Sequence, residues 1–70
     1  MNIETVAENL RNTIAGKEHL LDQYSRVLDG DKMLYEQKIA ASATSKFLEV
    51  NIAELKRILQ DVEQCIGAES

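Results

Sequence analysis

The sequence predicts an all-α fold: an antiparallel two-helix hairpin with a long second helix that oligomerises into a helical bundle. The 70 residues include no proline and only three glycines, a composition that long helices tolerate better than loop-rich or β-rich folds. Apolar residues recur at intervals of three and four along two stretches, the period of amphipathic helices. One clear break, Asp29-Gly30-Asp31, separates the two stretches. We therefore expect residues 1–70 to form a single helical hairpin domain.

The first helix is expected over residues 3–28. Asn2 is a good N-cap residue, and Glu4 lies in the first turn, where the helix dipole favours an acidic side chain. Asp22 and Arg26 form an acid-before-base pair at spacing i,i+4, which supports a helix. The apolar stripe of this helix consists of Ile3, Val6, Leu10, Ile14, Leu21, Tyr24 and Leu28. Lys17 interrupts the stripe, and Leu20 and Val27 widen one of its edges.

The Asp29-Gly30-Asp31 segment is expected to end the first helix and begin the second. Gly30 can take the left-handed conformation that closes many helices, so we predict a positive φ there. Asp31 can then cap the next helix. So short a connection places consecutive helices antiparallel.

The second helix is expected over residues 32–66, a range without a helix breaker. Its weakest part is Ser42-Ala43-Thr44-Ser45, where hydroxyl side chains compete for backbone hydrogen bonds. A break there, giving three helices, is the alternative. The main stripe consists of Leu34, Gln37, Ala41, Thr44, Leu48, Ile52, Leu55, Leu59, Val62 and Ile66, flanked on one side by Met33, Ala40, Phe47, Ile58 and Cys65.

Folding the two stripes together about Gly30 predicts the core and the uncovered surface. In this pairing residue i meets roughly residue 61 − i. The residues expected to be most buried are Leu10, Leu21, Leu48, Ile52 and Leu55. The residues expected to extend beyond the first helix are Val62, Cys65 and Ile66.

A second apolar line lies on the side of the second helix opposite the main stripe. It consists of Tyr35, Ile39, Ala43, Val50 and Ala53. A two-helix hairpin covers only one face of a helix, so a second apolar line indicates a second contact surface, although scattered exposed apolar residues are ordinary. We predict that Tyr35, Ile39, Ala43 and Val50, together with Val62, Cys65 and Ile66, bind a partner. A homodimer is the simplest arrangement.

The composition excludes several classes of protein. A net charge of −4 with interleaved acids and bases argues against nucleic acid as a partner. No run of about 18 apolar residues occurs, so no membrane contact is expected. The first residues, Met1 to Glu4, lack the basic and apolar regions of a signal peptide, and the single cysteine excludes an internal disulfide. We expect a cytoplasmic protein with a reduced thiol.

No enzymatic site is expected in this sequence. His19 with Asp22 and Gln23 could form one edge of a metal site, but zinc needs more nitrogen or sulfur ligands, and a surface histidine is the simpler interpretation. Cys65, beside the stripe, is expected to be a small packing residue. There is no phosphate loop, zinc motif or nucleophile elbow, so we predict no catalytic residues, no metal and no cofactor.

Two resemblances to known families concern the second half of the chain and the architecture. The stretch from Phe47 to Leu59, followed by Asp61 to Cys65, resembles the C-terminal helix of small accessory proteins of lambdoid phages. This resemblance implies a phage-encoded protein that acts on a host protein or regulatory complex. A helical hairpin of this length is also similar to the small co-chaperones of type III secretion needle subunits, which pair with a larger helical-repeat chaperone.

The predicted function is a non-enzymatic protein-interaction module, in first place an accessory protein that binds a larger host protein. A type III secretion co-chaperone or self-associating helical hairpin is the second hypothesis. A nucleic-acid-binding regulator is the third. The expected partners are a second copy of the chain, a larger protein, or both.

Overall fold

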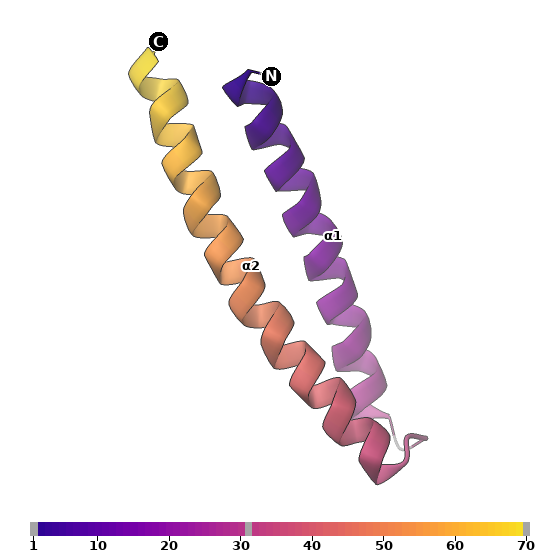
Figure 1. Cartoon of the computed structure of the whole chain (residues 1–70). Coiled ribbons are helices and arrows are strands. Elements are labelled where there is room, and N and C mark those ends of the chain that lie inside the picture. Colours follow the sequence, from indigo (N-terminus) through magenta and orange to yellow (C-terminus); the bar gives the residue numbers. More distant parts are fainter. Residues whose placement is uncertain (1, 31, 70) are drawn as a thin grey trace.

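Two long helices lie side by side and are joined by a short connection (Figure 1). The computed structural model describes residues 2–30 and 32–69, which contain α1 (Ile3–Asp29) and α2 (Tyr35–Glu69) and no strand. The molecule measures 52 × 17 × 15 Å. The start of α1 and the end of α2 lie at the same end of the molecule (Figure 1). The predicted all-α helical hairpin is confirmed for this part of the chain.

The beginning of α1 follows the prediction. The Asn2 side chain accepts a hydrogen bond from the Thr5 N–H at 2.8 Å, and the Asn2 carbonyl accepts one from the Val6 N–H at 3.3 Å. The expected pair within the helix also forms, with 3.0 Å between Arg26 and Asp22. The predicted N-cap at Asn2 is therefore confirmed.

The prediction of a positive φ at Gly30 is wrong. Gly30 has φ −84° and ψ 154°, an extended conformation, and its N–H donates to the Val27 carbonyl at 3.1 Å. The extended backbone leads the chain away from α1 before it turns back, so a left-handed residue is not needed at this position. The predicted capping by Asp31 lies outside the described residues.

The second helix begins three residues later than predicted and is continuous. The Leu34 N–H donates to the Gln37 side chain at 3.2 Å, which satisfies one backbone donor that a helix start leaves free. The predicted weak stretch at residues 42–45 stays helical, and the Thr44 hydroxyl donates to the Ala40 carbonyl at 3.0 Å. The three-helix alternative is therefore wrong, and α2 continues past Ile66 to Glu69.

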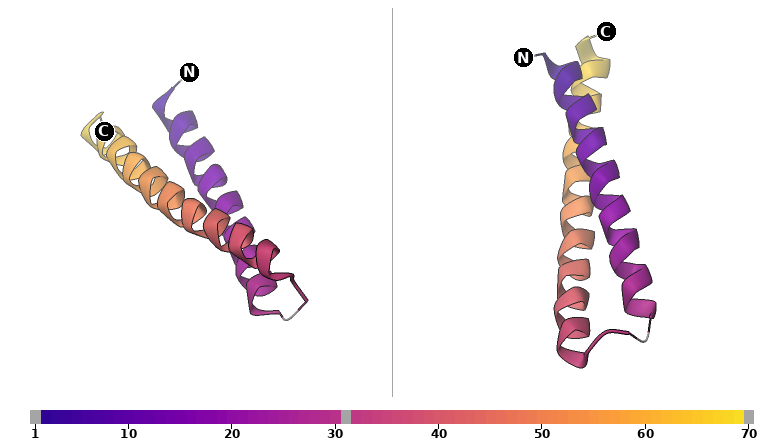
Figure 2. Two further views of the ribbon diagram at one scale, coloured as in Figure 1. Left: turned by 60° about the horizontal axis from the view of Figure 1, so that its bottom comes forward. Right: turned by 90° about the vertical axis from the view of Figure 1, so that its right-hand side faces the viewer.

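The predicted pairing of the two helices is also wrong. Arg11 lies 3.3 Å from Glu63, and Glu18 lies 3.5 Å from Lys56, so the numbers of paired residues add up to 74 and not to 61. The physical reason is the connection: the chain runs on beyond the end of α1, and α2 begins past that end (Figure 2).

The shifted pairing moves the uncovered part of α2 to its other end. The predicted extension of the C-terminal residues past α1 is wrong, because Val62 and Ile66 are half-buried and Ile66 lines a cleft together with Ala7 of α1. The first turn of α2 extends past α1 instead, and Leu34 and Tyr35 are exposed there. With 35 residues against 27, α2 is longer than α1 by about 12 Å at 1.5 Å per residue.

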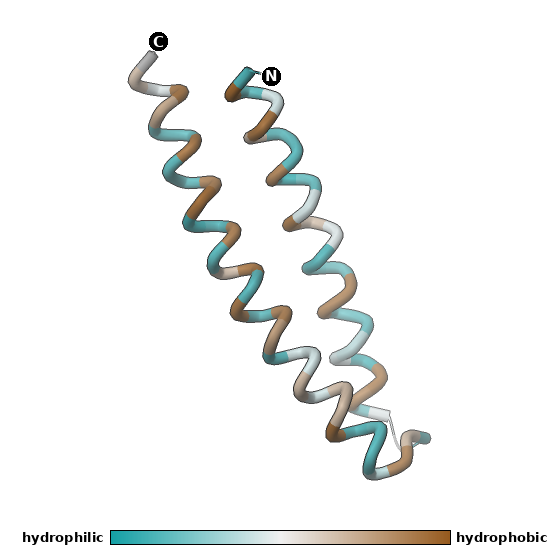
Figure 3. The backbone as a smooth tube through the Cα atoms, viewed as in Figure 1, coloured by the Kyte–Doolittle hydropathy of each residue, from teal (hydrophilic) through white to brown (hydrophobic). Residues whose placement is uncertain are grey.

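The buried residues form a narrow line between the helices. In the part of the chain that the structure describes, they are Ala7, Ile14, Ala41, Leu48 and Ile52. Leu48 and Ile52 confirm the predicted core, whereas Leu10, Leu21 and Leu55 are only half-buried, and their prediction as most buried residues is wrong. A single neighbouring helix covers only the side chains that point straight at it, and the short alanines are covered completely. Apolar residues recur along both helices beyond this line (Figure 3).

Candidate interaction surfaces

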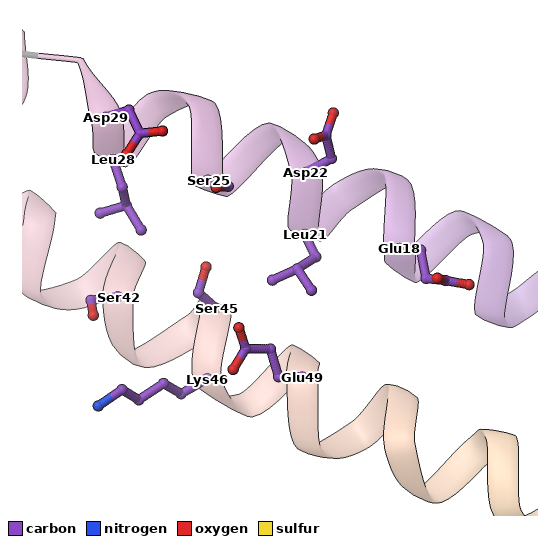
Figure 4. A pocket seen from close by; sticks show the side chains of 10 residues that line it. All are labelled: Glu18, Leu21, Asp22, Ser25, Leu28, Asp29, Ser42, Ser45, Lys46 and Glu49. Carbon is purple, nitrogen blue, oxygen red and sulfur yellow. The ribbon is translucent and has the colours of Figure 1, made fainter.

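One broad side of the hairpin, the polar face, is lined by charged and hydroxyl side chains from both helices (Figure 4). An open cleft of about 570 Å³ lies there, and its polar lining residues are Glu18, Asp22, Ser25 and Asp29 of α1 and Ser42, Ser45, Lys46 and Glu49 of α2. Leu21 and Leu28 point across the cleft toward α2, whereas Asp22 points away from it. The Glu18–Lys56 ion pair, 3.5 Å long, bridges the helices beside the cleft.

The polar face has the character of a solvated surface. Its ion pairs are about half exposed, with side-chain exposures of 51% and 49% for Arg11 and Glu63. Exposed pairs of this kind contribute little to stability. No three His, Cys, Asp or Glu side chains gather anywhere in the described residues as a group that could hold a metal ion. His19 contacts Gln23 at 3.3 Å on the exposed surface of α1.

The opposite broad side of the hairpin is apolar on both helices. At 100° per residue, Leu20 and Val27 lie about 140–180° around α1 from Glu18, Asp22 and Ser25, and Tyr24 lies about 100–160° from them. By the same geometry, Phe47 and Ile58 lie about 140–180° around α2 from Ser42 and Glu49. Because the polar residues of both helices line one cleft, these apolar residues of both helices share the other side. This apolar face consists of Val6, Leu10, Thr13, Lys17, Leu20, Tyr24 and Val27 of α1 and Ala40, Thr44, Phe47, Asn51, Leu55, Ile58, Val62 and Cys65 of α2.

The apolar face has both a projecting side chain and a hollow. Phe47 is 71% exposed and lies at the outer edge of the face on α2. At the outer edge on α1, a shallow hollow of about 220 Å³ is lined by Leu20, Gln23, Tyr24, Val27 and Met33. Ile58, between Phe47 and the end of α2, is 49% exposed. Large apolar side chains left this open make the apolar face a candidate contact surface.

Among the polar residues of the apolar face, Lys17 and Asn51 differ from the exposed Thr13 and Thr44 in their burial. Lys17 and Asn51 are both half-buried, and the side-chain oxygen of Asn51 is buried without a hydrogen-bond partner. A buried polar atom without a partner costs free energy, so such residues are seldom placed in an apolar surface for stability alone. In helical bundles a single Asn or Lys in an apolar seam fixes the pairing at the expense of stability.

The predicted partner-binding residues are divided among three places by the structure. Tyr35, Ile39, Ala43 and Val50 are exposed on α2, away from both α1 and the centre of the apolar face, and we call them the outer line. Val62 and Ile66 are half-buried against α1, with Val62 toward the apolar face. Cys65 is exposed at the edge of the apolar face.

Sequence reasoning missed the apolar face as one surface. Phe47 and Ile58 were expected only as flanks of the main stripe, and Leu20 and Val27 only as its widened edge. The signal that could have found it is a second series with alternating intervals of four and three, running from Val6 through Leu10 to Val27. A helix with two such adjacent series is typical of bundles with more than two helices.

Comparisons with known proteins add no family to these observations. No family model, curated protein or solved structure matches the chain. Within the described residues, neither helix is long and apolar enough to cross a membrane.

Proposed function

We propose that this protein is a non-enzymatic interaction module: an antiparallel helical hairpin that acts by binding other helices through its uncovered apolar side chains. One observation carries the proposal. Among the described residues, eight large apolar side chains are exposed, whereas five residues, two of them alanines, are buried. A hairpin with so small a core gains stability when a partner covers the remaining apolar surface.

Two kinds of partner follow from the resemblances of the sequence. An accessory protein of the lambdoid phage type would use the hairpin to bind a host protein or regulatory complex in the cytoplasm. A hairpin of the type III secretion co-chaperone kind would pair with a larger helical chaperone. In both cases the partner contributes helices with apolar stripes of their own, because an apolar helical surface is covered best by another helix.

The apolar face and the outer line are proposed to be the two contact surfaces. The outer line contains the exposed side chains Tyr35, Ile39 and Val50, and it lies on the helix that extends past α1. The net charge of −4 and the mixed signs on the polar face make a nucleic acid the least suitable partner.

Affinity capture from cells of the source organism tests the function. Tagged wild-type protein is compared with a Phe47→Glu, Ile58→Glu variant of the apolar face, an Ile39→Glu, Val50→Glu variant of the outer line, and a Glu49→Gln variant of the polar face as control. We expect one protein, identified by mass spectrometry in stoichiometric amount, to be lost with an apolar-to-Glu variant and kept with the control. If all four proteins capture the same set, the exposed apolar residues are not a binding surface.

A further inference from the structure

We propose that a second copy of this chain covers the apolar face, so that two hairpins form a four-helix bundle whose two-fold axis runs along the helices. This choice of occupant rests on the proposed function, in which the uncovered apolar side chains are a contact surface. It adds the chemistry of one partner, the geometry of the complex and the residues that meet.

The exposed area of the hairpin exceeds what a compact chain of this mass exposes. The accessible surface is 5453 Å² for 7.9 kDa. A compact monomer of that mass exposes about 4,400 Å² by the usual scaling of surface with mass. The excess of roughly 1,000 Å² per copy is larger than the about 800 Å² that each partner buries in a standard stable interface. Pairing two copies through one broad side accounts for this excess.

The apolar face is complementary to itself. A two-fold axis along the helices places α2 of each copy over α1 of the other, at the same height. Phe47 then approaches the hollow of the second copy, because Phe47 and Val27 lie at the same height in the hairpin and both lie at the outer edge of the face. Aromatic rings pack well against such apolar hollows, and the symmetry makes this contact twice.

A two-fold axis across the helices would not bring these elements together. It would place α1 on α1 and α2 on α2 with their ends reversed, so the hollow on α1 would face another α1 and Phe47 would face another α2. Only the two-fold axis that runs along the helices places Phe47 of one copy at the hollow of the other, and this contact favours that axis.

Lys17 and Asn51 explain how the pairing of copies is fixed. Both lie on the apolar face and are half-buried in the hairpin, and covering the face takes them further from water. A lysine or asparagine in an apolar seam lowers affinity but disfavours shifted pairings, in which it would be buried without a partner. Replacing Lys17 by an apolar residue of similar size removes this cost and keeps the apolar area, so it is expected to lower the dissociation constant of the dimer.

Sedimentation equilibrium of the full chain measures the association. We expect wild type to form a dimer, and we expect Phe47→Glu to raise the dissociation constant at least about 100-fold, because a hot-spot side chain is replaced twice in a symmetric interface. The matched control is Ala15→Glu, the same charge introduced at an exposed apolar residue of α1 that belongs to neither the apolar face nor the outer line. This variant is expected to keep the dissociation constant of wild type within about threefold.

Phe47→Glu could weaken the dimer by unfolding the hairpin, so a second variant and a distance between two spin labels test the dimer independently. Lys17→Met, which retains the apolar volume, is expected to tighten the dimer about tenfold. In a Cys65→Ser, Ala68→Cys protein with one spin label per chain, the proposed axis holds the two labels at the same end, roughly 15–30 Å apart, because neighbouring helices are 8–10 Å apart. An axis across the helices would place the labels toward opposite ends of a molecule 52 Å long.

The outcomes separate this proposal from the proposed function. A monomeric wild type at high micromolar concentration, a dimer that Phe47→Glu leaves intact, or labels farther apart than about 35 Å would each overturn the four-helix bundle. If wild type is monomeric but captures a cellular protein that Phe47→Glu loses, the function stands and the second copy is the wrong occupant. If the dimer forms as described but nothing else is captured, the bundle stands and the function in binding other proteins fails.

Discussion

Replacing Ile52 by alanine tests the core directly, because Ile39 provides the same substitution on the same helix at an exposed position. Ile52 is 6% exposed and Ile39 is 53% exposed. The change removes roughly three methylene equivalents, worth about 2.4 kcal/mol when fully buried at about 0.8 kcal/mol each, before any cavity is counted. At Ile39 about half of this applies, roughly 1 kcal/mol. Both changes gain the same few tenths of a kcal/mol from the better helix propensity of alanine.

We therefore expect Ile52→Ala to lower the free energy of unfolding by at least about 1 kcal/mol more than Ile39→Ala, which corresponds to roughly 4–8 °C in melting temperature for a domain of this size. The measurement is urea unfolding followed by far-UV circular dichroism, with both variants at one protein concentration because association raises apparent stability. Equal losses for the two variants would show that Ile52 is not at the helix–helix contact and would refute the pairing of α1 with α2 described above.

The remaining predictions concern caps and glycines, and thermal unfolding at one protein concentration measures each of them. Asn2→Ala should lower stability by about 1 kcal/mol because the Thr5 N–H loses its acceptor, whereas Asn2→Asp should keep it; equal effects would exclude the cap. Gly16→Ala should raise stability by about 0.5–1 kcal/mol, since it lies within α1 and a Cβ there meets no atom within 4 Å. Gly30→Ala should raise it by about 0.4–1 kcal/mol because φ −84° suits alanine, and a clear loss would indicate a left-handed Gly30 in solution.

Local features of the helices could be predicted because they depend on neighbouring residues alone. The cap at Asn2 and the Asp22–Arg26 pair need only spacing within one helix, and both are present as expected. The pairing of the helices depends instead on the backbone of the connection. A left-handed Gly30 would have turned the chain back at once, whereas the extended Gly30 shifts α2 along α1. Residue types near a turn do not distinguish these two conformations, because glycine adopts both.

The core was predicted only in part because the apolar stripe of α1 combines the residues that contact α2 with residues of the apolar face. Leu10 and Tyr24 lie toward the apolar face, whereas Ile14 points directly at α2. The sequence pattern does not separate these two sets of residues, so the predicted centre of the stripe falls between them. It also omits Ala7, which is fully buried but weakly hydrophobic. Complete burial at a helix–helix contact depends on how closely the backbones approach, and a small side chain allows the closest approach.

The width of the apolar stripe in α1 is itself an argument for a bundle of more than two helices. A helix with one neighbour needs a seam of two positions in seven. One position is provided by Ala7, Ile14, Leu21 and Leu28, and the other by Ile3, Leu10 and Tyr24. Leu20 and Val27 lie at a third position in seven, outside this seam, and both side chains are exposed. Apolar residues at such positions expose the molecule to nonspecific association unless a partner covers them. Exposed apolar residues also lie on the same side of α2, at Phe47 and Ile58. A single neighbour that covers both helices would therefore explain the additional apolar residues of each helix.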